Sequence, residues 1–120
     1  PGFTQPNGLA VEQISRDPAE VKKYEDDPLV HGKLTAITGM SMLEAASFLD
    51  DYEGEFPVPL LLMHGTADGI TSPEGSEDFS KRITGDVTFH LWDGLYHEIH
   101  NEPEKQQVMT MATDWIAARL

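Results

Sequence analysis

Two short polar loops carry the residue types that could do chemistry in this chain. Residues 64–69 read His-Gly-Thr-Ala-Asp-Gly, and residues 93–98 read Asp-Gly-Leu-Tyr-His-Glu. A carboxylate bonded to one imidazole nitrogen fixes the tautomer of the ring and leaves the other nitrogen free to take a proton from a nucleophile. Asp68 and His97 are therefore candidates for the acid and the base of a catalytic triad. The glycines in both loops suit chains that turn sharply as they leave buried strands.

Each of these loops follows a segment that reads as a β-strand. Residues 58–63 form the continuous apolar run Val-Pro-Leu-Leu-Leu-Met, which is typical of a parallel strand covered on both faces, and residues 87–92 alternate like a second strand. In open parallel sheets, functional groups gather in the loops that leave the carboxyl ends of the strands. We therefore predict that the two strands pair in parallel and bring Asp68 and His97 within hydrogen-bonding reach.

Helices are predicted beside these strands. Ser-Pro-Glu at residues 72–74 opens a helix that ends near Gly85, and Asn-Glu-Pro-Glu at residues 101–104 opens a final helix. The order strand, helix, strand, helix implies a right-handed parallel crossover.

The first part of the chain carries weaker signals. Residues 1–13 read as irregular, and Asp17 followed by Pro18 starts a short helix. Apolar positions over residues 30–49 keep roughly helical spacing and predict a longer amphipathic helix, which an acidic loop at residues 50–55 follows.

Several of these segments together resemble a known family. Residues 59–68, Pro-Leu-Leu-Leu-Met-His-Gly-Thr-Ala-Asp, and residues 94–102, Gly-Leu-Tyr-His-Glu-Ile-His-Asn-Glu, are similar to the acid and base segments of monoacylglycerol lipases and lysophospholipases, which are serine aminopeptidase-like α/β-hydrolases. Upstream, residues 7–9 and 15–33 resemble the cap of that family and the helix after it. The resemblance implies the C-terminal part of an α/β-hydrolase fold, with the end of the cap and the following helix in residues 1–50 and the strand-helix-strand-helix part of the core in residues 51–120.

The resemblance also implies a function and a class of substrate. Asp68 matches the triad acid and His97 the triad base of a serine hydrolase that cleaves fatty-acid monoesters and needs no cofactor. Whether ester or peptide bonds are cleaved stays open, because related hydrolases include aminopeptidases. A non-catalytic alternative is an interaction module that pairs with another chain.

The nucleophile of such an enzyme is absent from this sequence. The family requires a Gly-x-Ser-x-Gly elbow, and none occurs in the 120 residues. The nearest imitation, Gly-Met-Ser-Met-Leu at residues 39–43, has Leu43 where the tight turn needs glycine and lies within a helical pattern, so Ser41 reads as an ordinary helix serine. The isolated chain is therefore expected to be inactive.

Simpler interpretations of the two loops also exist. Asp68 could cap local backbone N–H groups, and His97 could be a structural histidine near the start of the last helix. The run His-Glu-Ile-His at residues 97–100 is one residue short of a zinc-binding His-Glu-x-x-His motif and lacks a convincing third ligand, so no metal is predicted.

Composition limits the partners and the location. A formal net charge of −13 repels phosphate backbones and argues against nucleic-acid binding. The chain has no cysteine, which is compatible with the reducing cytoplasm, and no apolar run approaches a membrane span. Two strands do not make an independently stable sheet, so we expect either self-association or a complex with the missing N-terminal half.

Overall fold

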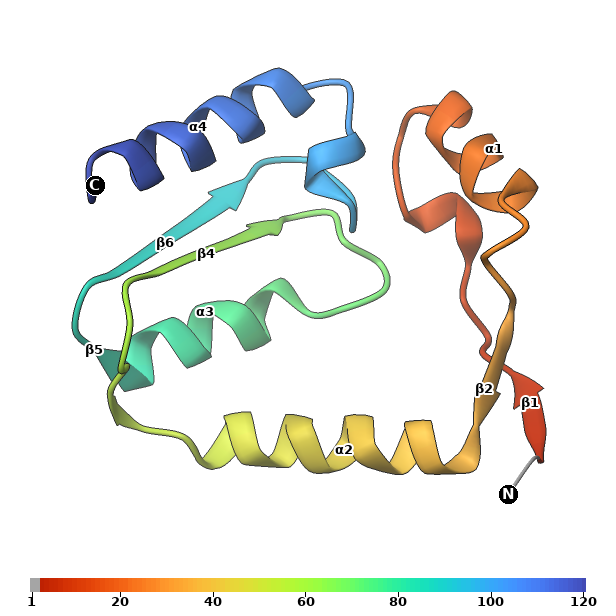
Figure 1. Cartoon of the computed structure of the whole chain (residues 1–120), viewed down its shortest axis with the longest axis horizontal. Helices are drawn as coiled ribbons and strands as arrows, with labels where there is room; N and C mark the ends of the chain where they lie inside the picture. The colour runs from red at the N-terminus through yellow and green to blue at the C-terminus, as the bar shows by residue number, and fades with distance from the viewer. Residues whose placement is uncertain (1–2) are drawn as a thin grey trace.

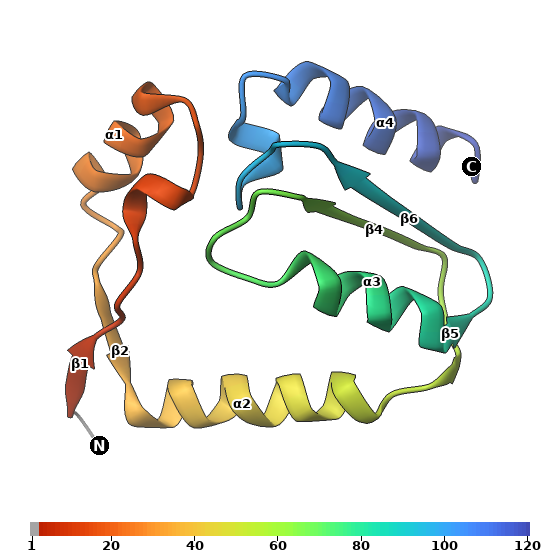
Figure 2. The same cartoon turned by 180° about the vertical axis from the view of Figure 1, so that it is seen from behind.

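A pair of parallel strands with helices beside it forms the centre of the molecule. The computed structural model describes residues 3–120. Strand β4 (Leu60–Gly65) pairs in parallel with β6 (Val87–Trp92), in the register Leu60↔Val87 to Gly65↔Trp92. Figures 1 and 2 show α3 (Pro73–Arg82) and α4 (Lys105–Ala117) on opposite sides of these strands. The predicted parallel pair and its flanking helices are confirmed.

Local signals explain where these elements begin and end. The apolar run predicted from residue 58 forms a strand only from Leu60, because prolines at positions 57 and 59 have no N–H to donate to a ladder. Helix α3 starts as predicted: Ser72 Oγ accepts a hydrogen bond from Gly75 N at 3.1 Å, and Pro73 takes the first helical position. The final helix begins later than predicted, since a 3₁₀ turn, η2 (Ile99–Asn101), precedes α4.

A second parallel pair lies at the other end of the crossover. Strand β3 (Gly54–Glu55) pairs with β5 (Ile83–Thr84), which follows α3 directly. The predicted acidic loop at residues 50–55 and the predicted end of α3 near Gly85 are therefore corrected. Gly85 has φ +109°, a conformation that side-chain-bearing residues rarely adopt, so the chain can turn there from β5 toward β6.

The N-terminal part contains an antiparallel pair of short strands and two further helical segments. Strand β1 (Thr4–Pro6) pairs antiparallel with β2 (Lys33–Thr35), which corrects the irregular interpretation of residues 1–13; residues 1 and 2 of that segment lie outside the described part. The 3₁₀ turn η1 (Val11–Gln13) leads to α1 (Pro18–Asp26). Asp17 caps α1 as predicted, since its side chain accepts a hydrogen bond from Ala19 N at 2.9 Å.

Helix α2 (Ala36–Asp51) begins six residues later than the predicted helix over residues 30–49. Residues 33–35 are extended because they pair with β1, and Thr35 then caps the helix by accepting a hydrogen bond from Thr38 N. The helix leaves most of its large apolar side chains exposed: Ile37, Met40, Met42, Leu43 and Phe48. Its C-terminal end contacts α3, where Leu49 O accepts a hydrogen bond from Arg82, and the ring of Tyr52, directly after the helix, lies against Phe79.

The buried core is small and lies around the ends of the central strands. The buried apolar side chains are those of Ile14, Ile83, Leu95 and Val108. Ile14 lies beside the loop after β6, because its carbonyl oxygen accepts a hydrogen bond from Glu98 N at 2.7 Å. Within residues 3–120, no helix is both long and apolar enough to cross a lipid bilayer.

Candidate active site

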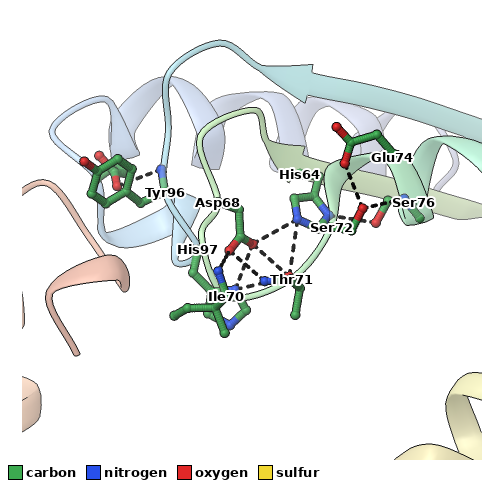
Figure 3. Close-up of polar contacts among 11 residues, drawn as sticks. His64, Asp68, Ile70, Thr71, Ser72, Glu74, Ser76, Tyr96 and His97 are labelled. Carbon is green, nitrogen blue, oxygen red and sulfur yellow. Dashed lines mark hydrogen bonds and ion pairs between the residues drawn. The ribbon is translucent and has the colours of Figure 1, made fainter. Parts of the chain in front are cut away.

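The loop after β4 holds the Asp68 carboxylate by hydrogen bonds from its own residues. Oδ1 accepts from the backbone N–H groups of Ile70 at 2.8 Å and Thr71 at 3.0 Å, and Oδ2 accepts from Thr71 Oγ1 at 2.8 Å (Figure 3). Burial alone would raise the pKa of Asp68, but these bonds and one from His97 outweigh it and hold the pKa well below its usual range. Asp68 is therefore an ionised hydrogen-bond acceptor at neutral pH.

The loop after β6 brings the His97 imidazole to this carboxylate. His97 Nδ1 lies 2.9 Å from Asp68 Oδ2 (Figure 3). The Asp68 side chain is 2% exposed and the His97 side chain 37% exposed, so the carboxylate is shielded while the imidazole reaches the surface. Because an ionised carboxylate only accepts, Nδ1 carries the proton and donates it. His97 Nε2 makes no hydrogen bond to any residue in the described part, which leaves its lone pair free. The expected approach of the two side chains is confirmed.

Glycine allows the two loops to approach each other closely. A Cβ on Gly65 would lie 2.2 Å from the carbonyl oxygen of Leu95 and 2.5 Å from that of Tyr96. No side chain fits at this distance. Gly94 has φ +73°, which lets the second loop turn back toward the first. Glycine at positions 65 and 94 therefore allows two loops to meet at the strand ends: the loop after β4, which carries Asp68 and is called the acid loop, and the loop after β6, which carries His97 and is called the base loop.

A buried glutamate holds the base loop from the other side. Glu102 is fully buried, and its Oε1 accepts hydrogen bonds from Tyr96 N and Arg16 N, each at 3.0 Å. Its Oε2 accepts from Arg16 Nε at 2.6 Å. The sequence predicts Glu102 as part of a helix start and also places it in the segment that resembles the family. Its place in the family-like segment was a signal, but nothing in the spacing pointed to Arg16.

Backbone hydrogen bonds extend this contact to the residues around His97. His97 N donates to Gln13 O at 3.4 Å and Glu98 N donates to Ile14 O at 2.7 Å. Ser15 Oγ donates to Asn101 O at 2.9 Å. The segment between η1 and α1 is thus paired with the base loop along several residues, and it contributes to the position of the imidazole.

A second histidine contacts the same carboxylate oxygen. His64 Nε2 lies 2.9 Å from Asp68 Oδ2, and His64 Nδ1 lies 2.7 Å from Ser76 Oγ on α3 (Figure 3). No role for His64 follows from the sequence pattern, although this residue stands in the segment that carries the family resemblance. His64 lies close to Asp68 because the loop after β4 folds back toward the end of that strand.

The other candidate residues are not joined to this site. Ser41 lies on α2 with an exposed side chain, and no hydrogen bond links it to His97 within residues 3–120. No group of three or more His, Asp or Glu side chains with the arrangement of a metal site occurs in the described part of the chain. The arrangement that does occur is a carboxylate and an imidazole in hydrogen-bond contact through Nδ1.

Comparison with known proteins gives a consistent set of relatives. The sequence model of the family described as "Serine aminopeptidase, S33" matches residues 1–104. The chain is 35% identical to a monoacylglycerol lipase of Mycolicibacterium smegmatis, with 100% of this chain and 43% of that protein covered. It is 30% identical to a putative monoglyceride lipase of Schizosaccharomyces pombe, with 97% and 32% covered.

The fold comparison agrees with the sequence comparison. The crystal structure of Paleococcus ferrophilus monoacylglycerol lipase superimposes with a TM-score of 0.86 and 34% identity, covering 99% of this chain and 47% of that one. A monoglyceride lipase from Saccharomyces cerevisiae superimposes with a TM-score of 0.77. The chain spans less than half the length of each of these relatives.

Proposed function

The chain belongs to the serine aminopeptidase S33 family of hydrolases and has part of the α/β-hydrolase fold, and we propose on this basis that it supplies the acid and the base of a serine hydrolase acting on fatty-acid monoesters. The single observation that carries the proposal is the 2.9 Å contact between Asp68 Oδ2 and His97 Nδ1, which leaves His97 Nε2 free. An acid-base pair with one unoccupied imidazole nitrogen is what a serine nucleophile needs beside it.

The proposed reaction runs through His97 in both halves. Nε2 takes the proton of a serine hydroxyl as the serine oxygen attacks the ester carbonyl, and the imidazolium so formed is stabilised by the Asp68 carboxylate. The proton then passes to the departing alcohol and an acyl-serine remains. A water molecule attacks the acyl-serine while Nε2 accepts its proton, and that proton returns to the serine as the fatty acid leaves.

The serine and the oxyanion donors must come from outside these 120 residues, which contain no Gly-x-Ser-x-Gly elbow. The ester substrate follows from the relatives, which are named as lipases, and peptide cleavage is the competing outcome. Neither substrate calls for a cofactor in this mechanism.

We also propose a cytoplasmic location from the absence of cysteine, which cell fractionation with an antibody to the chain would test.

A comparison of the isolated chain with the chain joined to its serine-bearing segment tests the function. We expect the joined protein, and not the isolated chain, to hydrolyse a monoacylglycerol or a lysophospholipid and to be labelled by a fluorophosphonate probe for active serines. Hydrolysis of an aminoacyl anilide, in place of the ester substrates, would indicate a peptidase. Labelling of the isolated chain that disappears in Ser41→Ala would overturn the proposed source of the nucleophile.

An exposed apolar helix favours a second function that is compatible with the first. Ile37, Leu43 and Phe48 of α2 are each more than half exposed, and such a surface is unusual for a chain that stays alone in water. We propose that the chain pairs with another polypeptide, either its serine-bearing segment or a second copy. Sedimentation at micromolar concentration tests this, and a compact, cooperatively unfolding monomer would contradict it.

A further inference from the structure

A half-buried histidine next to the acid-base pair has no part in the proposed reaction. His64 is the last residue but one of β4, and its side chain is 12% exposed. Its Nε2 shares Asp68 Oδ2 with His97 Nδ1, each at 2.9 Å, and Thr71 Oγ1 donates to the same oxygen at 2.8 Å. Three donors therefore surround the one oxygen that serves His97.

The contacts of His64 determine its tautomer. The ionised Asp68 carboxylate only accepts, so His64 Nε2 must carry a proton and donate it. A neutral ring then has its lone pair on Nδ1, and this nitrogen lies 2.7 Å from Ser76 Oγ, whose hydroxyl donates to it. The result is a chain of hydrogen bonds from Ser76 to His64 to Asp68, with both His64 nitrogens occupied. His64 therefore cannot itself serve a substrate as a base.

The consequence for Asp68 lies in the orientation of its second oxygen. Oδ1 is held by two backbone N–H groups of its own loop, whereas Oδ2 is held only by side chains. We propose that His64, fixed by Ser76, is a positioning residue that keeps Asp68 Oδ2 directed at His97 Nδ1. The proposal rests on the proposed function, because it gives His64 its effect through the acid of that mechanism.

The tautomer is the first test, and it needs no activity. In the 120-residue chain labelled with ¹⁵N-histidine, two-bond proton-nitrogen correlations at neutral pH should show His64 as a single tautomer with its proton on Nε2. In His64→Leu, the Nδ1 proton signal of His97 should broaden or disappear, because its acceptor is no longer held. A proton on His64 Nδ1 alone, or a mixture of tautomers, would overturn the proposal.

The second test measures turnover in the protein joined to its serine-bearing segment. His64→Leu should lower kcat roughly tenfold to a hundredfold with KM nearly unchanged, since a misdirected acid affects the reaction and not ground-state binding. His64→Gln places an amide nitrogen near the position of Nε2 and should restore kcat to within about threefold of wild type. His90→Leu is the matched control, because His90 lies on β6 and makes no side-chain hydrogen bond to Asp68.

A milder variant covers the case in which His64→Leu does not fold. Ser76→Ala removes only the outer hydrogen bond and should lower kcat roughly threefold to tenfold, the worth of one hydrogen bond. Ser80→Ala on the same helix is its control, because Ser80 Oγ donates to Glu77 O and not to His64. Unchanged turnover in Ser76→Ala, with wild-type turnover in any folded His64→Leu, would overturn the inference.

Failure of this inference differs from failure of the proposed function. If Asp68→Asn and His97→Ala hydrolyse the ester as fast as wild type, the proposed function is wrong whatever His64 does. If those two variants are inactive and His64→Leu is fully active, only the positioning role is wrong.

Discussion

The loop that carries the acid and the loop that carries the base are held in opposite ways. Most hydrogen bonds to the Asp68 carboxylate come from residues close to it in sequence, 64, 70 and 71, and one comes from His97. The base loop depends on contacts with residues 13–16. Ser15 bonds to Asn101 and Arg16 bonds to Glu102, and each pair is 86 positions apart in the sequence. The orientation of the Asp68 carboxylate therefore depends chiefly on residues near it in sequence, whereas the base loop is bonded to a distant N-terminal segment.

The N-terminal part of the chain contacts the base loop directly. The segment that meets the base loop joins η1 to α1, and both precede the long helix α2 (Figure 1). Changes in residues 13–16 should therefore affect His97 directly, because Gln13 O accepts a hydrogen bond from His97 N, and also through Glu102, which accepts from Arg16 N and Tyr96 N. Asp68 variants should have their largest effect on turnover, while variants of the contacts between the base loop and residues 13–16 should have their largest effect on stability.

The largest expected effect is on turnover and concerns the acid. In the protein joined to its serine-bearing segment, Asp68→Asn should lower kcat on the order of ten-thousandfold, because the amide no longer fixes the tautomer of His97. Steady-state ester hydrolysis measures this, and circular dichroism should show an unchanged fold. A decrease of less than about tenfold would reduce Asp68 to a loop cap.

The next effect separates the base loop from the acid loop. Glu102→Ala leaves Tyr96 N and Arg16 without their buried acceptor and should lower the free energy of unfolding by roughly 2–4 kcal/mol. Glu104→Gln is the matched control, because Glu104 bonds to the same Arg16 at an exposed position and should cost less than about 1 kcal/mol. Urea unfolding measures both. Equal losses in the two variants would contradict the special role of the buried carboxylate.

The pH dependence of stability should distinguish the ionised acid. The pKa of Asp68 is depressed in the folded chain, so its contribution is fully present above the ordinary carboxyl pKa of about 3.9 and is lost as pH falls below it toward the folded pKa. Urea unfolding of wild type and Asp68→Asn between pH 7 and pH 3 should show a stability difference that is constant near neutrality and shrinks at the acid end. A stability difference between wild type and Asp68→Asn that grows as the pH falls would contradict a depressed pKa of Asp68 in the folded chain.

The smallest effect concerns the helix that follows the acid loop. Ser72→Ala removes the N-cap of α3 and should lower the free energy of unfolding by about 1 kcal/mol. Ser47→Ala, at an exposed interior position of α2, should change it by less than about 0.5 kcal/mol. Because Ser72 bonds only to its own helix start, its loss should leave the Glu102 contacts of the base loop intact. Hydrogen-exchange rates of the Tyr96 and Arg16 amide protons, which both donate to Glu102, should therefore be unchanged in Ser72→Ala.

The sequence alone was sufficient for the elements whose signals are local. Ser72 with Pro73 and Asp17 with Pro18 start helices because a side-chain acceptor and a missing N–H act within one turn. The apolar run before Gly65 and the alternation before Trp92 predicted two strands, and parallel pairing then brought Asp68 toward His97. These inferences need only a few neighbouring residues and one topological rule.

Tertiary structure alone decided the features that depend on distant pairing. Residues 33–35 have helical spacing but form a strand, because β1 supplies backbone partners some 30 positions away. Glu102 is buried because Arg16 reaches it, and His64 bonds to Asp68 because the loop after β4 folds back across the strand end. Such contacts leave no periodicity in the sequence. Their free energy comes from removing charged and polar groups from water next to partners that only the folded chain brings close.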